Sequence, residues 1–225
     1  MNITSSQLQA RARETLGKKI FGRKWMMAVA VYFVLSIIMG FSLSVFEKTY
    51  TIGDFTYDFS FDLPIGSIIL AGPVMFGMCK SFLFATRTKN EMNFSLAFDG
   101  FKNFKKTFLL GLIQNIYIFL WALLLIVPGI MKAYSYSMSY YIMEDHPEYT
   151  WRECLAESER LMKGNRWRLF CLDLSFIGWF IVGVLCLGVG VLWVYPYLNA
   201  ARAEFYNDLI GYVNIFEEPA PDDYI

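Results

Sequence analysis

Three charged side chains, Lys80, Asp173 and Arg202, interrupt stretches of the sequence that are otherwise strongly apolar. Ionisable groups inside a membrane are costly, so they usually face the interior of a helical bundle and serve ion or solute pathways. The same groups could instead form a structural ion pair, since long basic side chains near a membrane boundary also reach toward water. The sequence favours the structural role for this candidate buried-charge cluster, because no substrate-shaped set of polar groups accompanies it.

The depth of these groups follows from helical geometry. At a rise of about 1.5 Å per residue, Asp173 lies roughly 7.5 Å beyond Arg168, and Arg202 lies roughly 9 Å before Asp208. Lys80 precedes Thr86 by the same roughly 9 Å. All three charges are thus at a similar depth, and we predict that Asp173 faces inward within ion-pair reach of Arg202 or Lys80. A fourth charge, Lys132, follows a predicted turn and can extend out of the membrane.

The sequence gives little support for a metal site, a catalytic motif or a disulfide framework. His146 in "EDHPE" has no second soft ligand at a useful spacing, so no metal site and no cofactor are expected. No GxSxG, HExxH or glycine-rich phosphate loop is present. The cysteines show no paired spacing and are expected to be reduced and structural. They are Cys79, Cys154, Cys171 and Cys186.

Tyrosines cluster in "YSYSMSYY", where Tyr134, Tyr136, Tyr140 and Tyr141 could line a polar cavity. Tyrosine is also the usual residue of membrane interfaces, and small residues spaced by four indicate helix packing surfaces. Such spacing occurs between Ser135 and Ser139, between Ala133 and Ser137, and along Gly77, Ser81 and Ala85. The spacing favours packing over a cavity.

The elements that carry these residues are predicted to be membrane helices. Hydrophobic residues make up 56% of the 225-residue chain, above the roughly 45–50% of soluble domains. Uncharged runs over 25–46 and 108–131 each exceed the roughly 18 residues that indicate a spanning helix. No cleavable signal peptide is apparent, so 25–46 is expected to remain as the first span.

The net charge of zero hides a strong segregation. Basic residues concentrate in 1–24, 87–107 and 152–168, whereas the segment 47–62 holds one lysine against four carboxylates. Basic segments remain cytoplasmic, so both termini are predicted inside and the acidic loop 47–62 outside. The basic residues suit the anionic lipid headgroups of the cytoplasmic face, and nucleic acid is not an expected partner.

An amphipathic segment precedes each pair of apolar stretches. In 151–162 the apolar stripe includes Trp151, Leu155 and Met162, and Thr150 with Glu153 forms a capping-box start. Similar stripes occur in 94–104 and in the N-terminal segment. Helices of this kind lie in the headgroup plane, so we predict three interfacial helices with their apolar faces toward the bilayer.

The whole pattern predicts an all-α, polytopic membrane protein with about six transmembrane helices arranged as three hairpins, each preceded by an interfacial amphipathic helix. A single integral-membrane domain covers 1–210, in units of about 1–86, 87–145 and 146–210. An acidic tail, 211–225, is expected to be disordered and cytoplasmic. The predicted spans are 25–46, 63–86, 106–127, 128–145, 168–187 and 190–209.

Three stretches carry a resemblance to a known family: "PGIMKAYSYSMSYYIMED", "SERLMKGNRWRLFCLDLSFIGW" and "YPYLNAARAEFYNDL". The chain resembles the bacterial integral-membrane proteins known as domain of unknown function 975, over nearly its whole length and most densely in 128–209. The resemblance implies a multi-pass protein of the bacterial plasma membrane. It assigns no activity and no catalytic residue.

Three functions remain open. The first is a non-enzymatic membrane module, scaffolding or lipid-interacting, in envelope physiology. The second is a small transporter or permease subunit, with a homo-oligomer or a membrane protein partner as further expectations. The third, an intramembrane enzyme, has the least support because no nucleophile–base or metal set is present. A polar cavity reaching the membrane midplane would favour transport, whereas a solid bundle would favour the module.

Overall fold

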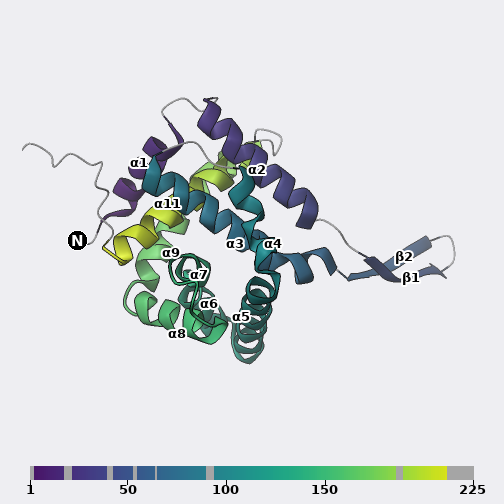
Figure 1. Ribbon diagram of the computed structural model, residues 1–225. Helices are drawn as coiled ribbons and strands as arrows, with labels where there is room; N and C mark the ends of the chain where they lie inside the picture. Colours follow the sequence, from purple (N-terminus) through teal and green to yellow (C-terminus); the bar gives the residue numbers. More distant parts are fainter. Residues whose placement is uncertain are drawn as a thin grey trace, which may run out of the picture.

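The computed structural model describes residues 3–17, 22–39, 43–52, 55–63, 65–89, 94–185 and 190–211. Within these residues the chain is helical apart from one two-stranded hairpin (Figure 1). The elements are α1 (Ser5–Leu16), α2 (Arg23–Met39), β1 (Leu43–Ile52), β2 (Phe55–Leu63), α3 (Ile65–Thr88), η1 (Phe94–Phe98), α4 (Asp99–Lys102), α5 (Phe104–Leu124), α6 (Ile126–Ser135), α7 (Ser139–Asp145), α8 (Trp151–Met162), α9 (Arg166–Ser175), α10 (Ile177–Leu185) and α11 (Val191–Leu209).

The helix α3 lies at the centre of the arrangement. It packs against α2, α5, α7 and α11, and 67% of the residues in its most apolar stretch are buried. The corresponding stretches of α5 and of α9–α10 are only 17% and 22% buried, so these helices are peripheral. Figure 1 shows α5 and α6 extending away from α3 toward the bottom of the view, while the β1–β2 hairpin projects to the right.

Three helical stretches are long and apolar enough to cross a membrane: Ile69–Thr88, Phe104–Leu124 and Arg166–Leu185. They correspond to the predicted spans 63–86, 106–127 and 168–187. The helical class and the presence of candidate spans are thus confirmed. The count of six spans and the division into three units remain predictions.

Two predicted spans consist of two helices each. The stretch 128–145 is divided into α6 and α7 by a turn at Tyr136–Met138, and 168–187 is divided into α9 and α10 near Phe176. Ser135, at the end of α6, donates its hydroxyl to the Met131 carbonyl oxygen. Such side-chain bonds to the preceding turn compete with helical bonds and bend helices.

The segment 47–62, predicted as an acidic loop, instead forms most of an antiparallel hairpin. β1 pairs with β2 from Leu43 opposite Leu63 to Ile52 opposite Phe55. Strand β1 starts inside the predicted first span, and α2 ends at Met39. The physical reason is composition: aromatic and β-branched residues alternate with polar ones on both sides of "GD", which favours strands over an irregular loop.

The amphipathic helices α1 and α8 pack their apolar faces on the protein, which corrects the prediction that these faces meet the bilayer. The capping box of α8 is confirmed, with Thr150 and Glu153 bonding reciprocally. However, Leu155 and Met162 are buried against α5, α6 and α7. In α1, Leu8 is likewise buried, and the helix packs along α11. The stripes of α1 and α8 are buried because other helices of the bundle present apolar surface to them.

Glycines allow α3 to approach its neighbours closely. A Cβ on Gly72 would lie 2.2 Å from the Thr107 carbonyl oxygen in α5. A Cβ on Gly77 would lie 1.8 Å from the Ala97 carbonyl oxygen in η1. The predicted packing surface at Gly77 and Ser81 therefore faces the segment before α5. A residue larger than glycine at position 77 would clash with the backbone of that segment.

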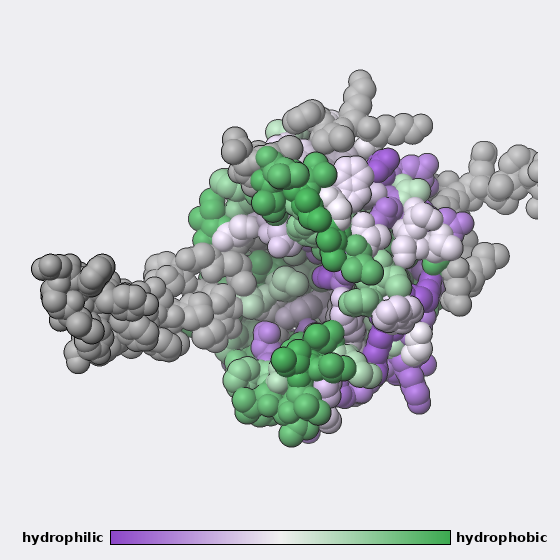
Figure 2. Space-filling view, turned by 180° about the vertical axis from the view of Figure 1, so that it is seen from behind, coloured by the Kyte–Doolittle hydropathy of each residue, from purple (hydrophilic) through white to green (hydrophobic). Residues whose placement is uncertain are grey.

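Large apolar side chains are exposed on the peripheral helices. At the junction of α5 and α6, Leu123 and Ile126 are each 74% exposed, and on α10 Leu185 is 76% exposed. Figure 2 shows apolar side chains in an upper and a lower lobe, with a hollow of paler residues between them and hydrophilic side chains to the right. Exposed apolar surface of this extent is characteristic of a membrane or partner interface.

The acidic tail, predicted to be disordered, lies from residue 212 onward outside the described residues.

Candidate functional site

A cavity of about 340 Å³ lies between α3, α5, α6, α7, α9 and α11. This volume is within the range of about 300–1,000 Å³ that is typical of small-molecule sites. Its polar lining comes from five of these six helices, and Met75 and Cys79 on α3 contribute apolar surface. The polar lining residues are Gln114, Tyr134, Ser137, Tyr140, Tyr141, Asp173, Asn199 and Arg202.

Asp173 and Arg202 form an ion pair at the edge of this cavity. The Arg202 Nη2 and Nε atoms donate to the Asp173 carboxylate oxygens at 2.7 and 3.1 Å. The Tyr134 hydroxyl donates to the same carboxylate at 3.1 Å. The side chain of Arg202 remains 34% accessible and that of Asp173 17%. The structure thus brings together two of the three predicted residues.

Two polar groups of the cavity are without a partner among the described residues. The ion pair uses Nε and Nη2 of Arg202, so the two N–H groups of Nη1 are left for another acceptor. On α5, the Gln114 Oε1 atom is buried and accepts no hydrogen bond. An unpaired buried acceptor costs free energy on the order of 1–3 kcal/mol.

Three of the four clustered tyrosines line the cavity, although the sequence favoured packing for all of them. Tyr134, Tyr140 and Tyr141 contribute to its wall. Tyr136 does not: it is 7% exposed and its ring lies 6.3 Å from that of Tyr117. Tyr136 is the first residue of the turn between α6 and α7, whereas the other three tyrosines lie on the two helices.

Lys80 is not part of the Asp173 group. Its ammonium lies 3.1 Å from Asp99 and 2.9 Å from Glu144. These partners come from α4 and α7, because η1 and α4 pack alongside α3 at Gly77. A hydrogen bond from Lys102, joined by one from Lys80, outweighs burial and lowers the pKa of the Asp99 carboxyl below its ordinary value.

Lys132 also has an acidic partner that the sequence did not predict. Its ammonium lies 2.7 Å from the Glu159 carboxylate and 5.6 Å from the centre of the Trp121 ring. Glu159 belongs to α8, which was predicted at the level of the cytoplasmic headgroups and away from Lys132. The contact instead places α8 beside α6, where it covers the bundle.

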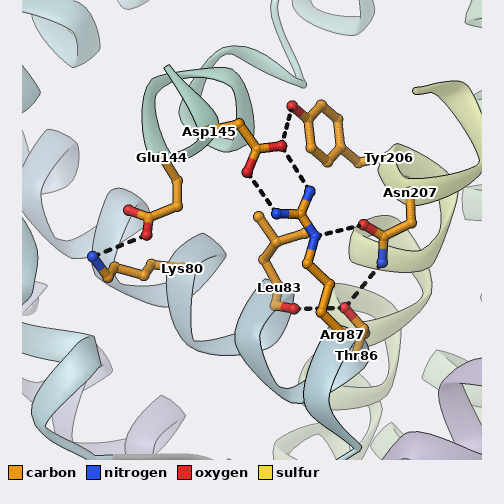
Figure 3. A network of polar contacts seen from close by, with 8 residues as sticks. All are labelled: Lys80, Leu83, Thr86, Arg87, Glu144, Asp145, Tyr206 and Asn207. Carbon is orange, nitrogen blue, oxygen red and sulfur yellow. Dashed lines mark hydrogen bonds and ion pairs between the residues drawn. The ribbon is translucent and has the colours of Figure 1, made fainter. Parts of the chain in front are cut away.

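A second polar network joins α3, α7 and α11, as Figure 3 shows. Arg87 donates to both carboxylate oxygens of Asp145 at 2.6 and 2.7 Å, and to Asn207 Oδ1 at 3.1 Å. The Tyr206 hydroxyl donates to Asp145 at 2.9 Å. The Tyr206 ring stacks on Tyr141 of the cavity wall at 5.2 Å. This network therefore lies directly beside the cavity.

The residues considered for metal chemistry lie apart from the cavity, except for Cys79. His146 Nδ1 is 3.1 Å from Glu148, and its ring stacks on Tyr149 at 4.5 Å. In the part of the chain that the structure describes, no group of three or more His, Cys, Asp or Glu residues could hold a metal ion. Cys79, Cys154 and Cys171 are free thiols, and Cys186 lies outside the described residues.

Comparison with known proteins supports one family. The family model described as "Protein of unknown function (DUF975)" matches residues 123–211. The predicted resemblance is thus confirmed for this part of the chain, which contains α6 to α11 and hence Asp173 and Arg202. No curated protein and no solved structure matches significantly.

Proposed function

We propose that this protein is a non-enzymatic, multi-pass protein of the bacterial plasma membrane that binds a small polar solute in the cavity, as a small transporter or permease subunit. The cavity is the observation that carries the proposal. A scaffold needs only a packed bundle, whereas this bundle places an ion pair and three tyrosines around a partly open cavity.

The exposed apolar surface supports the membrane part of the proposal. The two least buried candidate spans expose long runs of Leu, Ile, Val and Phe, which in water would favour aggregation. In a bilayer the same side chains contact lipid at no cost. The charged groups beside the cavity would then be inside the bundle, where ionisable residues of membrane proteins normally face.

The proposed orientation keeps both termini and the basic segments 87–107 and 146–165 in the cytoplasm, next to anionic headgroups. Single cysteines introduced into 47–62 should react with a membrane-impermeant maleimide in intact cells, and cysteines in the two basic segments should not. Labelling of 87–107 from outside would overturn this orientation.

Transport is testable with a cavity-filling variant. Proteoliposomes should release a series of small polar solutes (glycerol, γ-aminobutyrate and glucose) faster than protein-free liposomes, for at least one member. Ala133→Trp places a large ring in the cavity wall and should abolish that release. Val184→Trp, on the 63% exposed face of α10, is the matched control and should leave release unchanged. Release by no solute, or equal release by Ala133→Trp, would contradict the proposal.

The lipid-interacting module remains the second candidate function. The observation in its favour is the exposed apolar junction of α5 and α6, where residues 123–127 are all at least 62% exposed. Such a surface would also suit a membrane protein partner or a second copy of the chain.

A further inference from the structure

We infer that the β1–β2 hairpin is a membrane-surface element, which lies with an aromatic face against the lipid headgroups and an acidic face toward water. This role concerns a part of the chain that the cavity does not involve. It rests on the membrane location in the proposed function and does not depend on solute binding.

The strand register divides the hairpin into two faces of opposite polarity. Residues paired across antiparallel strands share a face, and successive residues along a strand alternate between faces. The register from Leu43 opposite Leu63 to Ile52 opposite Phe55 therefore places every aromatic residue of the two strands on one face, which we call the aromatic face. These residues are Phe46, Tyr50, Phe55, Tyr57, Phe59 and Phe61.

The charged residues are divided by the same register. Glu47, Asp58 and Asp62, the acidic residues of the two strands, all lie on the opposite face, which we call the polar face. The other paired residues of that face are serines and threonines. Lys48 is the basic residue of the strands, and it lies on the aromatic face opposite Phe59. The hairpin is thus amphipathic along its whole length.

The aromatic face has no cover within the described part of the chain. No described helix packs extensively on either strand, and Figure 1 shows the hairpin projecting away from the bundle. An isolated two-stranded hairpin is at best marginally stable in water, and apolar strands left exposed promote aggregation. The face therefore needs a covering surface, and a hairpin attached only at its base can tilt onto one.

The connections of the hairpin place it beside the bilayer. Strand β1 begins at Leu43, shortly after α2 ends at Met39, and β2 ends at Leu63, just before α3 begins at Ile65. The candidate span of α3 starts at Ile69. Tyrosine is enriched at the level of the headgroups, and phenylalanine is common on the apolar faces of interfacial elements. The lipid surface is thus within reach and matches the composition of the face.

The distribution of charge favours lipid over a second copy of the chain. Packing two aromatic faces together would bury Lys48 against a surface without a carboxylate, because the acidic residues lie on the polar face. Burial of an unpaired charge is strongly unfavourable. At a bilayer, a lysine can instead extend to the phosphates of anionic lipids, while the carboxylates of the polar face remain in water.

Fluorescent labels at four successive positions test this placement. The full-length protein, with its native cysteines replaced by alanine, would carry the environment-sensitive dye nitrobenzoxadiazole at Tyr57→Cys, Asp58→Cys, Phe59→Cys or Ser60→Cys. Each variant would be placed in nanodiscs of phosphatidylglycerol and phosphatidylcholine. We expect short-wavelength emission and quenching by spin-labelled lipid at 57 and 59, and water-like emission with quenching by iodide at 58 and 60.

The depth of the labels and their reactivity in cells give two further measurements. Interfacial elements sink about 5–10 Å into the boundary between headgroups and acyl chains, so a spin label near the headgroup should quench more than one near the chain end. In intact cells, the membrane-impermeant maleimide should react faster with Asp58→Cys and Ser60→Cys than with Phe59→Cys.

A label at Leu185→Cys on α10, where the side chain is 76% exposed, is the control for the membrane location of the bundle. Lipid quenching there, with the same behaviour at all four hairpin positions, would overturn the inference and leave the proposed function standing. Short-wavelength emission at 57 and 59 without lipid quenching would mean that protein covers the face, which also overturns the inference. No lipid quenching at any position, Leu185→Cys included, would contradict the proposed membrane location as well.

Two variants with the same change in net charge test the role of Lys48. Lys48→Gln and Thr49→Glu each lower the charge of the hairpin by one unit, the first on the aromatic face and the second on the polar face. A lysine near an anionic membrane strengthens binding about fivefold. Lys48→Gln should therefore reduce lipid quenching at Phe59→Cys in phosphatidylglycerol nanodiscs, whereas Thr49→Glu should leave it nearly unchanged. Equal reductions by the two variants would refute the contact of Lys48 with lipid.

Discussion

Replacing Asp145 by asparagine should destabilise the bundle strongly, because it removes the carboxylate that accepts two charged hydrogen bonds from Arg87. The pair is bidentate, at 2.6 and 2.7 Å, and the accessible fractions of the two side chains are only 21% and 18%. Removing one partner of such a pair typically costs about 3–5 kcal/mol. The remaining accessibility, and the Tyr206 hydroxyl that can still bond an amide oxygen, favour the lower end of that range.

A loss of about 3 kcal/mol lowers the midpoint of thermal unfolding by roughly 6–12 °C in a protein of this size. Circular dichroism of the detergent-solubilised protein would measure it. Arg87→Gln combined with Asp145→Asn should lose less than the sum of the two single variants, because the two side chains are coupled through their ion pair and the double variant carries neither charge. Arg160→Gln is the control, since its Glu157 pair lies on the surface with Arg160 69% exposed, and should leave the midpoint nearly unchanged.

Two results would refute the reasoning. One is a midpoint for Asp145→Asn within about 2 °C of the wild type, which would mean less than roughly 1 kcal/mol in the pair. The other is strict additivity in the double variant, which would mean that Arg87 and Asp145 act independently.

The remaining predictions concern the other ion pair, the close helix crossing and a helix cap. Asp173→Asn should lower the thermal midpoint, and adding Arg202→Gln should restore part of the loss; a further drop in the double variant would count against the pair. Gly77→Ala should cost about 1–3 kcal/mol through its backbone clash, whereas Gly178→Ala, with nothing within 4 Å, should be neutral or stabilising; equal midpoints would contradict the close packing. A hydrogen bond from the Thr150 backbone N–H lowers the pKa of Glu153, so its stabilisation of α8 is complete at neutral pH. That stabilisation is lost as the pH falls below about 4.3 and through the lowered pKa, so the midpoint difference between the wild type and Glu153→Ala should shrink from pH 7 to pH 3. A midpoint difference that grows on acidification would contradict the predicted role of the ionised Glu153.

The sequence predicted the helical stretches well because the length of an apolar run is itself the physical requirement for a spanning helix. The bounds of α3, α5 and α11 lie within a few residues of the predicted spans. The β1–β2 hairpin was missed although its signal was present: strand-like alternation on both sides of a glycine–aspartate pair. The acidic composition of 47–62 is also typical of an exposed loop, and the loop was the structure predicted.

The site was predicted only in part, because the sequence gives the depth of a residue along a helix but not the direction in which the residue faces. Depth along a helix follows from counting residues, and it correctly placed Asp173 beside Arg202. The direction in which a residue faces follows from amphipathicity, and helices that are apolar all round carry little of it. Hence the partners of Lys80 and Lys132, and the entire Arg87 network, could not be predicted from the sequence. The Lys80 and Lys132 pairs depend on how α4, α7 and α8 pack against the bundle, and the Arg87 network depends on how α7 and α11 pack against α3.

The accessibility of Ser137 tests the central claim, a polar cavity inside the bundle, most directly. Ser137 lines the cavity, whereas Ser135, two residues earlier, is fully buried outside its wall. Each would be replaced by cysteine in a variant whose four native cysteines are alanine, and the protein in nanodiscs would be exposed to 2-aminoethyl methanethiosulfonate. We predict that mass spectrometry finds Ser137→Cys modified and Ser135→Cys unmodified. If Ser137→Cys reacts no faster than Ser135→Cys, the bundle is solid at this position and the account is wrong.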